Sequence, residues 1–182
     1  LNLKLLGPAQ VHPPEDGPGR ARVVLAASTH EGEDEIVLDA YAEARRAVPD
    51  LRLILAPRHP RRGDAVAALI AARGLGFARR SQGGGVDAPV LLADSLGEMA
   101  DWYRAAGICV TCGSLVDHGG HTPWEPAAWR CAVLHGPHVA NHARDYADLA
   151  AAGGALAVTA QDLGAALADL AQDGERQRRM GR

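Results

Sequence analysis

Polar side chains and glycines are interleaved in residues 113–126 in a way that suits a bound phosphate and ribose. Glycines allow a ligand to approach the backbone closely, while hydroxyl, imidazole and carboxylate groups supply hydrogen bonds. Glu125 stands where a helix is expected to begin, so its carboxylate could accept hydrogen bonds from two ribose hydroxyls beside N–H groups that face a phosphate. A glutamate that merely begins a helix would not explain the glycines and histidines before it. The candidate residues of this stretch are Gly113, Ser114, Gly119, Gly120, His121 and Glu125.

A second candidate turn, residues 28–32, joins an apolar run to a helical pattern. Ser28, Thr29 and Gly32 would offer hydroxyls and free backbone N–H groups to an anion. Helix capping by Ser28 or Thr29 would explain the hydroxyls, but not the presence of His30 and Glu31. We therefore interpret the turn as part of a binding site.

Arg58 follows the next apolar run, where its guanidinium could form a forked contact with a phosphate or a carboxylate. A lone arginine is also common as a solvated surface charge, so this assignment depends on its neighbours. No Gly-x-Gly-x-x-Gly pattern follows the first apolar run, and no Walker phosphate loop is present. The sequence therefore gives little support to a dinucleotide or P-loop site.

Two close pairs of residues invite a metal or redox interpretation, but their context argues against it. Cys109 and Cys112 have the spacing of a zinc or redox pair, yet they end an apolar strand, where residues three apart face opposite sides of a sheet. His118 and His121 are separated by two glycines and match neither helical nor same-face strand spacing. We expect no metal and no cofactor, and a reducing compartment for the thiols.

These turns must be positioned by alternating strands and helices. Short apolar runs indicate strands buried on both faces, and segments with apolar residues at helical spacing separate them. The expected strands are residues 22–27, 51–56, 77–80, 90–93, 108–111, 132–135 and 155–158. The expected helices begin near 33, cover 61–73, 96–106, 124–130 and 144–152, and end with one from 160. This order predicts an α/β fold, a Rossmann-like parallel sheet with helices on both faces, whose ligand lies beyond the carboxyl ends of the strands.

Composition agrees with one α/β domain and excludes some partners. The 182 residues suffice for a single core, and with only seven aromatic residues that core must be built from Ala, Val, Leu and Ile. We divide the chain into a proline-rich connector and loop, residues 1–21, and a core, residues 22–182. The net charge of −3 without a basic stripe argues against nucleic acid as a partner. No apolar run approaches the roughly 20 residues that span a bilayer, and no signal-peptide pattern is present.

Taken together, the turns resemble one family, the Kdo (3-deoxy-D-manno-octulosonic acid) transferases of lipopolysaccharide synthesis. The matching stretches run in the same order and spacing across almost the whole chain, which makes the resemblance specific although each match alone would be weak. They are Asn2–Lys4, Ala26–Glu35, Arg58–Pro60, Gly97–Met99, Gly113–Leu115, Gly119–His121, Glu125–Ala127, Gly136–His138 and Asn141.

The resemblance implies the C-terminal half of a metal-independent GT-B glycosyltransferase, the half that binds the donor CMP-Kdo for transfer to a lipid A precursor. It adds His59, Gly97, Glu98 and Asn141 to the expected donor-binding residues. In this family the acceptor site, the membrane anchor and the carboxylate proposed as catalytic base belong to the other half. We therefore expect no catalytic residue in this chain, weak donor binding and no turnover. The full-length protein would lie at the cytoplasmic face of the bacterial inner membrane, whereas this half would be soluble.

Two positions depart from the family pattern. Cys112 stands where glycine is usual, and Thr122 stands where asparagine is usual, so a bidentate contact from that amide would be lost. Two other functions stay open. A GT-B relative such as a UDP-sugar epimerase would prefer uridine nucleotides to cytidine nucleotides. A non-catalytic α/β binding domain would respond to no nucleotide.

Overall fold

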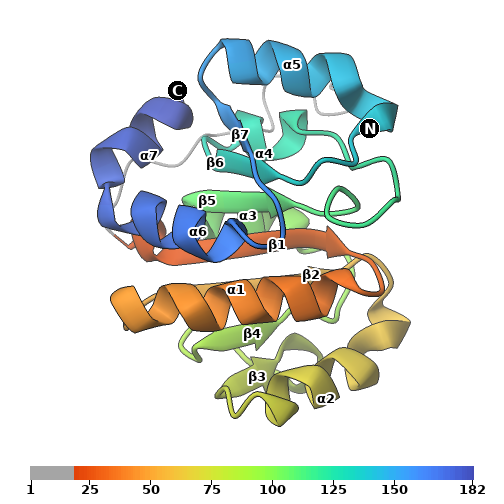
Figure 1. The fold of residues 1–182 in the computed structure, drawn as a ribbon. Helices are drawn as coiled ribbons and strands as arrows, with labels where there is room; N and C mark the ends of the chain where they lie inside the picture. The colour runs from red at the N-terminus through yellow and green to blue at the C-terminus, as the bar shows by residue number, and fades with distance from the viewer. Residues whose placement is uncertain (1–18) are drawn as a thin grey trace.

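A computed structural model describes residues 19–182. Their seven strands form one parallel sheet in the order β3-β4-β2-β1-β5-β6-β7 (Figure 1). The strands are β1 Val23–Thr29, β2 Arg52–Pro57, β3 Phe77–Arg79, β4 Val90–Leu92, β5 Ile108–Thr111, β6 Ala132–His135 and β7 Ala155–Ala157. The parallel sheet expected from the sequence is thereby confirmed. The predicted connector and the match at Asn2–Lys4 lie outside the described residues, except for the last three residues of that connector.

The described part also contains seven α-helices and four short 3-10 helices, most of which connect the strands. The α-helices are α1 Glu33–Ala47, α2 Gly63–Ala72, α3 Met99–Ala105, α4 Trp124–Ala128, α5 Ala143–Ala151, α6 Leu163–Gln172 and α7 Gly174–Met180. The 3-10 helices are η1 Arg20–Arg22, η2 Pro60–Arg62, η3 Arg80–Gln82 and η4 Ala140–His142. No helix within residues 19–182 combines the length and the apolar character needed to cross a membrane.

Each predicted strand is present, and the predicted helices differ from the structure at their ends and, for the last one, in an internal break. The helix expected over 61–73 begins as the 3-10 turn η2, and the one expected from 96 begins at Met99. The last helix divides at Asp173, whose backbone leaves the helical region and whose side chain accepts a hydrogen bond from Arg176 N at 3.0 Å. Asp173 therefore caps a second helix, which apolar periodicity alone does not indicate.

The side chains of the strands alternate between two helical layers. Val110 of β5 packs in the core under α1, α2 and α6, whereas its neighbour Cys109 packs on the opposite face with Trp102 of α3. Cys112 lies with Val110, so the prediction that Cys109 and Cys112 face opposite sides is confirmed. Figure 1 shows α1 and α6 side by side on one face of the sheet, with α3 and α4 on the other.

The order of the strands places the loops that contain most of the candidate binding residues next to one another. From the central strand β1 the chain moves to β2 on one side, and it later returns to add β5 on the other side. In open parallel sheets, ligands bind beyond the carboxyl ends of the strands at such a switch point. The loops after β1, β2, β4 and β5 therefore surround one place.

Candidate functional site

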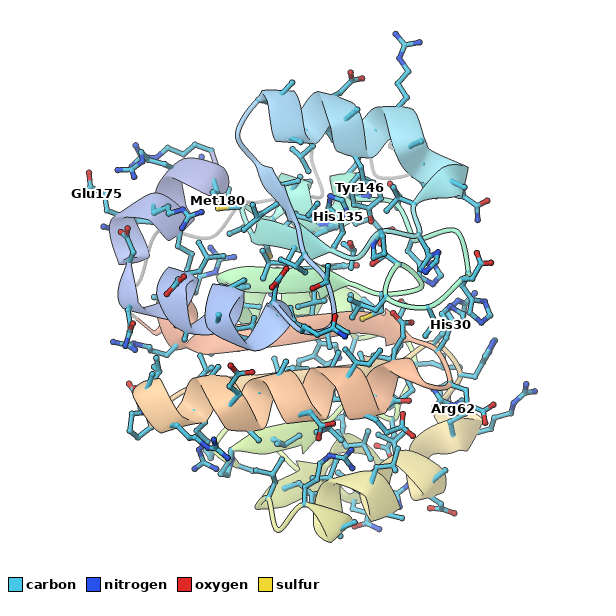
Figure 2. All side chains as sticks on the ribbon, in the orientation of Figure 1. His30, Arg62, His135, Tyr146, Glu175 and Met180 are labelled. Carbon is cyan, nitrogen blue, oxygen red and sulfur yellow. The ribbon has the colours of Figure 1, made fainter. Side chains whose placement is uncertain are left out.

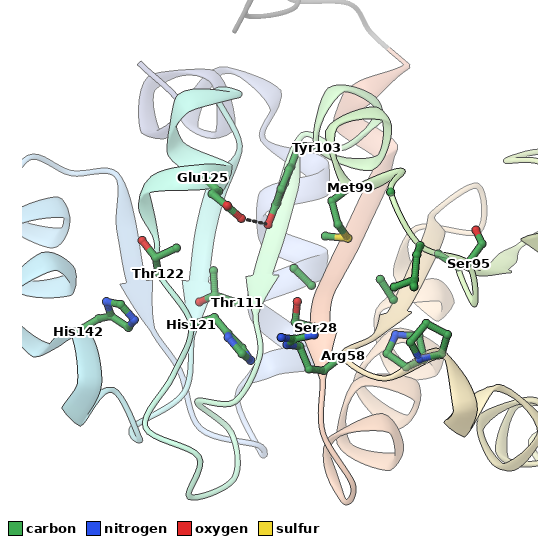
Figure 3. A pocket seen from close by; sticks show the side chains of 17 residues that line it. Ser28, Arg58, Ser95, Met99, Tyr103, Thr111, His121, Thr122, Glu125 and His142 are labelled. Carbon is green, nitrogen blue, oxygen red and sulfur yellow. Dashed lines mark hydrogen bonds between the residues drawn. The ribbon is translucent and has the colours of Figure 1, made fainter. Parts of the chain in front are cut away.

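A pocket of about 450 Å³ opens at this switch point (Figure 3). This volume is in the range of sites for small organic ligands. The wall is formed by the carboxyl ends of four strands and the loops after them, together with α3 and α4. The lining residues are Ala27, Ser28, Ala56, Pro57, Arg58, Pro60, Ala93, Ser95, Leu96, Gly97, Met99, Tyr103, Thr111, His121, Thr122, Glu125 and His142.

Five of the residues predicted from sequence meet at this pocket, although they come from four separate segments of the chain. They are Ser28, Arg58, Gly97, His121 and Glu125. Figure 3 shows Ser28 and Arg58 close together at the ends of β1 and β2, with His121 and Glu125 at the β5 side. The pocket therefore combines a cation, a carboxylate, a hydroxyl and an imidazole.

The backbone at Ser28 has a conformation that non-glycine residues seldom adopt. Its φ is 63°, and the register of β1 against β2 shifts between Ala27 and Thr29. Such a bulge redirects a side chain, and left-handed non-glycine residues are concentrated at functional sites. Thr29, the next residue, is fully buried and donates from Oγ1 to Asp34 Oδ1 at 2.6 Å. The hydrogen bond of Thr29 thus stabilises the turn between β1 and α1 from the protein interior.

Glu33 ties the loop after β1 to the loop after β5. Its fully buried carboxylate accepts hydrogen bonds from the backbone N–H groups of Gly113 at 2.6 Å, Leu115 at 3.3 Å and His30 at 3.0 Å. Burial raises the pKa of Glu33, and the three N–H donors oppose that shift. In the sequence Glu33 merely stands where a helix is expected to begin near residue 33, because nothing local indicates a contact with Gly113, 80 residues away.

Glycines shape the loop between β5 and α4. Gly119 has a φ of 76°, and a Cβ atom there would collide with the side-chain amide of Asn141. Gly120 has a φ of 79°, and its N–H donates to the Gly113 carbonyl at 3.0 Å. Asn141 donates its backbone N–H to the Gly119 carbonyl at 3.0 Å and its amide to the His118 carbonyl at 3.4 Å. Asn141 and the glycines therefore hold the loop in shape.

Two other predicted donor-binding side chains are engaged within the protein. Ser114 is fully buried; its Oγ donates to the Thr111 carbonyl at 2.5 Å and accepts from Gly136 N at 2.9 Å. Glu98 accepts from Ser95 Oγ at 2.5 Å and forms an ion pair of 2.8 Å with Arg80. The Arg80 guanidinium lowers the pKa of Glu98. Both side chains shape loops that surround the pocket.

Histidines from three loops meet beside the pocket. The Nε2 atoms of His30 and His121 are 2.9 Å apart, and the ring of His118 stacks on His30 with centroids 4.0 Å apart. The ring of His59 meets His30 edge-on at 6.4 Å. Burial, with the neighbouring histidines and Arg58, lowers the pKa of His30 to about 4, and burial also lowers the pKa of His121. Both rings are therefore neutral near pH 7.

Within residues 19–182 no group of three or more His, Cys, Asp or Glu side chains is arranged to hold a metal ion. His135, at the end of β6, is buried against Tyr146, with ring centroids 4.4 Å apart. Its Nδ1 lies 2.7 Å from the Gly136 carbonyl oxygen. Glu31, a predicted binding residue, is exposed at the tip of the turn before α1.

The structure adds side chains that sequence patterns did not indicate. Tyr103 is only 6% exposed, and its hydroxyl donates to Glu125 Oε2 at 3.2 Å. In the sequence it is a helix aromatic four residues after Met99, which is typical of a core position. Thr111 lines the pocket from the end of β5. Thr122, where the family pattern has asparagine, also lines it and accepts a hydrogen bond from Trp124 N at 3.3 Å.

Comparison with known proteins gives a consistent set of sequence relatives. No family model matches the chain. Over 161 residues it is 39% identical to the 3-deoxy-D-manno-octulosonic acid transferase of Haemophilus influenzae, a match that covers 86% of this chain and 38% of the relative. Over 140 residues it is 42% identical to the enzyme of the same name from Bordetella pertussis, covering 74% of this chain and 33% of the relative. The chain thus spans less than two fifths of these relatives.

Solved structures agree in fold. The C-terminal CMP-Kdo binding domain of WaaA from Acinetobacter baumannii matches with a TM-score of 0.83 and 29% identity, over 95% of this chain and 91% of that chain. WaaG, a glycosyltransferase involved in lipopolysaccharide biosynthesis, matches with a TM-score of 0.55 over 89% of this chain and 41% of that chain. At 13% identity WaaG shows the fold alone. The fold is that of the C-terminal domains of GT-B glycosyltransferases.

Proposed function

Because the chain is homologous to the Kdo transferases, we propose that it is the CMP-Kdo-binding domain of a glycosyltransferase that transfers Kdo to a lipid A precursor. The observation that carries this proposal is the convergence of Ser28, Arg58, Gly97, His121 and Glu125 on one pocket. Each of these residues lies at the end of a strand or in the segment that follows one, up to the first turn of α4. Such segments carry binding residues in this type of sheet.

The polar groups of the pocket suit the parts of a cytidine monophosphate. In our account the Glu125 carboxylate accepts hydrogen bonds from the ribose hydroxyls, and the Arg58 guanidinium contacts the phosphate. Ser28 and the neutral imidazole of His121 contribute hydrogen bonds to the phosphate or to the Kdo carboxylate. Four other side chains would support these groups without contacting the ligand, because their hydrogen bonds hold the surrounding loops in place. They are those of Thr29, Ser114, Glu98 and Asn141.

The proposed reaction breaks the bond between the anomeric carbon of Kdo and a phosphate oxygen of CMP. An acceptor hydroxyl oxygen forms the new bond to that carbon and gives up its proton to a base. Negative charge grows on the departing phosphate, and an arginine beside it stabilises the transition state more than the ground state. We propose that Arg58 fills this role without a metal ion.

The base that deprotonates the acceptor is proposed to lie outside this chain, in the half that also carries the acceptor site and the contact with the membrane. The 182-residue chain should then bind the donor nucleotide but transfer no sugar. This division follows the relatives, of whose length the chain spans 38% and 33%.

The thermal midpoint of the chain in CMP, UMP and NAD at equal millimolar concentrations tests the proposed donor. A ligand that binds only the folded state raises the midpoint by mass action. We expect a rise with CMP, a smaller rise with UMP and none with NAD. A rise with UMP alone would favour a site for a uridine nucleotide-sugar, and no rise with any nucleotide would contradict the proposal.

Two variants make this test specific. Glu125→Ala should abolish the rise with CMP because it removes the proposed ribose contact. Glu175→Ala, on the exposed face of α7 and remote from the pocket, should leave the rise unchanged. Figure 2 shows Glu175 on the opposite side of the molecule from His30 and the pocket loops.

A further inference from the structure

Tyr103 and Glu125 form a pair that links two short helices across the pocket wall. Tyr103 is in α3 and Glu125 is in the first turn of α4, and the Tyr103 hydroxyl donates to Glu125 Oε2 at 3.2 Å (Figure 3). Both residues line the pocket. A ligand in the pocket that contacts this wall would therefore meet the pair.

The tyrosine is held rigidly. Its ring is 6% exposed and packs in the apolar cluster with Leu25, Ala27 and Cys109. Burial, followed by the nearby Cys109 and Glu125, raises the pKa of the Tyr103 hydroxyl well above 10. The hydroxyl is thus protonated at any ordinary pH and serves as a fixed hydrogen-bond donor.

A further residue fixes the spacing of the two helices. The Arg20 guanidinium donates to the Ala106 carbonyl at 2.6 Å, at the end of α3, and to the Trp129 carbonyl at 2.8 Å, at the end of α4. Cations at helix carboxyl ends satisfy the last carbonyl groups and interact favourably with the helix dipole. The Arg104 guanidinium also lies 5.1 Å from the centre of the Trp129 ring. The carboxyl end of α3 is therefore joined to both ends of α4, to Glu125 in its first turn and to Trp129 after its last.

This arrangement restricts the Glu125 carboxylate. One oxygen accepts the hydrogen bond from Tyr103, which leaves the other oxygen and the remaining lone pairs for a ligand. A carboxylate held in one orientation loses little side-chain entropy when it accepts hydrogen bonds from a ligand. A site with such a prepared acceptor rejects an analogue that lacks the matching hydroxyl, because the acceptor is then left without a partner.

We propose that Tyr103 is a specificity-determining residue that holds Glu125 in place, so that the pocket selects ribonucleotides over deoxyribonucleotides. The proposal rests on the function proposed above, in which Glu125 contacts the ribose. Tyr103 acts through Glu125, so it is a positioning residue rather than a catalytic one.

Titration calorimetry with CMP and 2′-deoxy-CMP tests this role. We expect the unaltered chain to bind CMP at least about tenfold more tightly than 2′-deoxy-CMP, a ratio that corresponds to 1.4 kcal/mol. Tyr103→Phe keeps the ring and removes only the hydroxyl. It should weaken CMP binding several-fold and 2′-deoxy-CMP binding less, because that ligand keeps only the 3′-hydroxyl, and so reduce the ratio. In the Glu125→Ala background the same change should have no further effect.

Tyr41→Phe is the matched control. It also removes a buried hydroxyl, one that donates to the Leu51 carbonyl at 2.7 Å and does not line the pocket. This variant should bind both nucleotides as the unaltered chain does. A loss of affinity for both nucleotides alike in Tyr103→Phe, or no loss for either, would overturn the inference.

The outcomes also separate this inference from the proposed function. If the unaltered chain binds CMP but binds 2′-deoxy-CMP equally well, the role of Tyr103 is refuted while the nucleotide site stands. If the unaltered chain binds no CMP at all, the proposed function itself fails.

Discussion

The imidazole rings of His30 and His121 lie with their Nε2 atoms 2.9 Å apart, so that one hydrogen bond joins the loop after β1 to the loop after β5. A neutral imidazole has one N–H donor and one acceptor nitrogen, and the pair therefore shares a single proton between the two facing atoms. A second proton at this position would place two N–H groups against each other. The contact thus requires that at least one of the two rings is neutral, with a free acceptor at its Nε2 atom.

Acidification should destabilise the fold through this pair. The pKa of His30 is lowered to about 4 by burial, by the neighbouring His118, His121 and His59, and by Arg58, whereas the unfolded chain has the ordinary value near 6.5. Between these values the unfolded state binds more protons, so stability falls as the pH drops from about 6.5 to 4. We predict that the thermal midpoint decreases between pH 7 and pH 5.

The variant His30→Asn isolates the contribution of this ring. It should reduce the acid-induced fall of the midpoint by about 2 °C or more, since 1 kcal/mol corresponds to about 2–4 °C for a chain of this size. His138→Asn, which replaces an exposed histidine, serves as the control. An equal fall in all three proteins would show that His30 does not carry the effect.

Removal of the Glu33 carboxylate should destabilise the whole domain. Glu33→Ala leaves the backbone N–H groups of Gly113, Leu115 and His30 without their buried acceptor. Unsatisfied buried donors cost about 1–3 kcal/mol each, and some of this is recovered when water enters, so we expect a total of about 3 kcal/mol in urea unfolding. Glu31→Ala, in the same turn but exposed, should change the free energy of unfolding by less than about 0.5 kcal/mol.

A methyl group at Gly119 should disturb the binding loop specifically. Gly119→Ala strains a backbone with a φ of 76° and also forces its Cβ against the amide of Asn141. Gly153→Ala carries a similar strain at a φ of 83°, but its Cβ meets nothing within 4 Å. Both variants should lose about 1 kcal/mol of stability, whereas only Gly119→Ala should weaken CMP binding, by about fivefold or more. Equal CMP affinity in the two variants would refute this role for the loop.

Loss of the Arg58 guanidinium should weaken phosphate binding. We predict that Arg58→Ala lowers the affinity for CMP about tenfold, as expected for one charge-assisted hydrogen bond, and lowers the affinity for cytidine hardly at all. The control Arg61→Ala replaces an exposed arginine of η2 that does not line the pocket. If cytidine and CMP lost affinity equally in Arg58→Ala, Arg58 would not act on the phosphate.

The strands and their order of succession could be predicted because each is a short apolar run buried on both faces, as the run around Leu25 and the run around Val110 illustrate. The loops could be proposed as binding loops because Gly, His and Glu are unusual together in a purely structural turn, and residues from several of them line the pocket. The bounds of the helices were predicted less accurately than the strands. The break at Asp173, for example, depends on one capping side chain.

The sequence could not reveal which side chains face the pocket and which support the loops. Ser114 has the character of a ligand-binding hydroxyl, yet it is fully buried between the Thr111 carbonyl and Gly136 N. Tyr103 has the pattern of a core aromatic, yet it reaches Glu125, 22 residues further along the chain. Both assignments depend on contacts between separate segments of the chain, which exist only once the sheet has formed.

A titration of the isotope-labelled chain with CMP, followed through its backbone amide resonances, tests the central claim most directly. The account predicts saturable changes that are largest around Ser28, Arg58, Gly97 and Glu125, with weaker changes in UMP at the same concentration. A lack of changes at these residues, or changes centred on the separate hollow near Leu149 and Met180, would contradict the assignment of this pocket to the donor nucleotide.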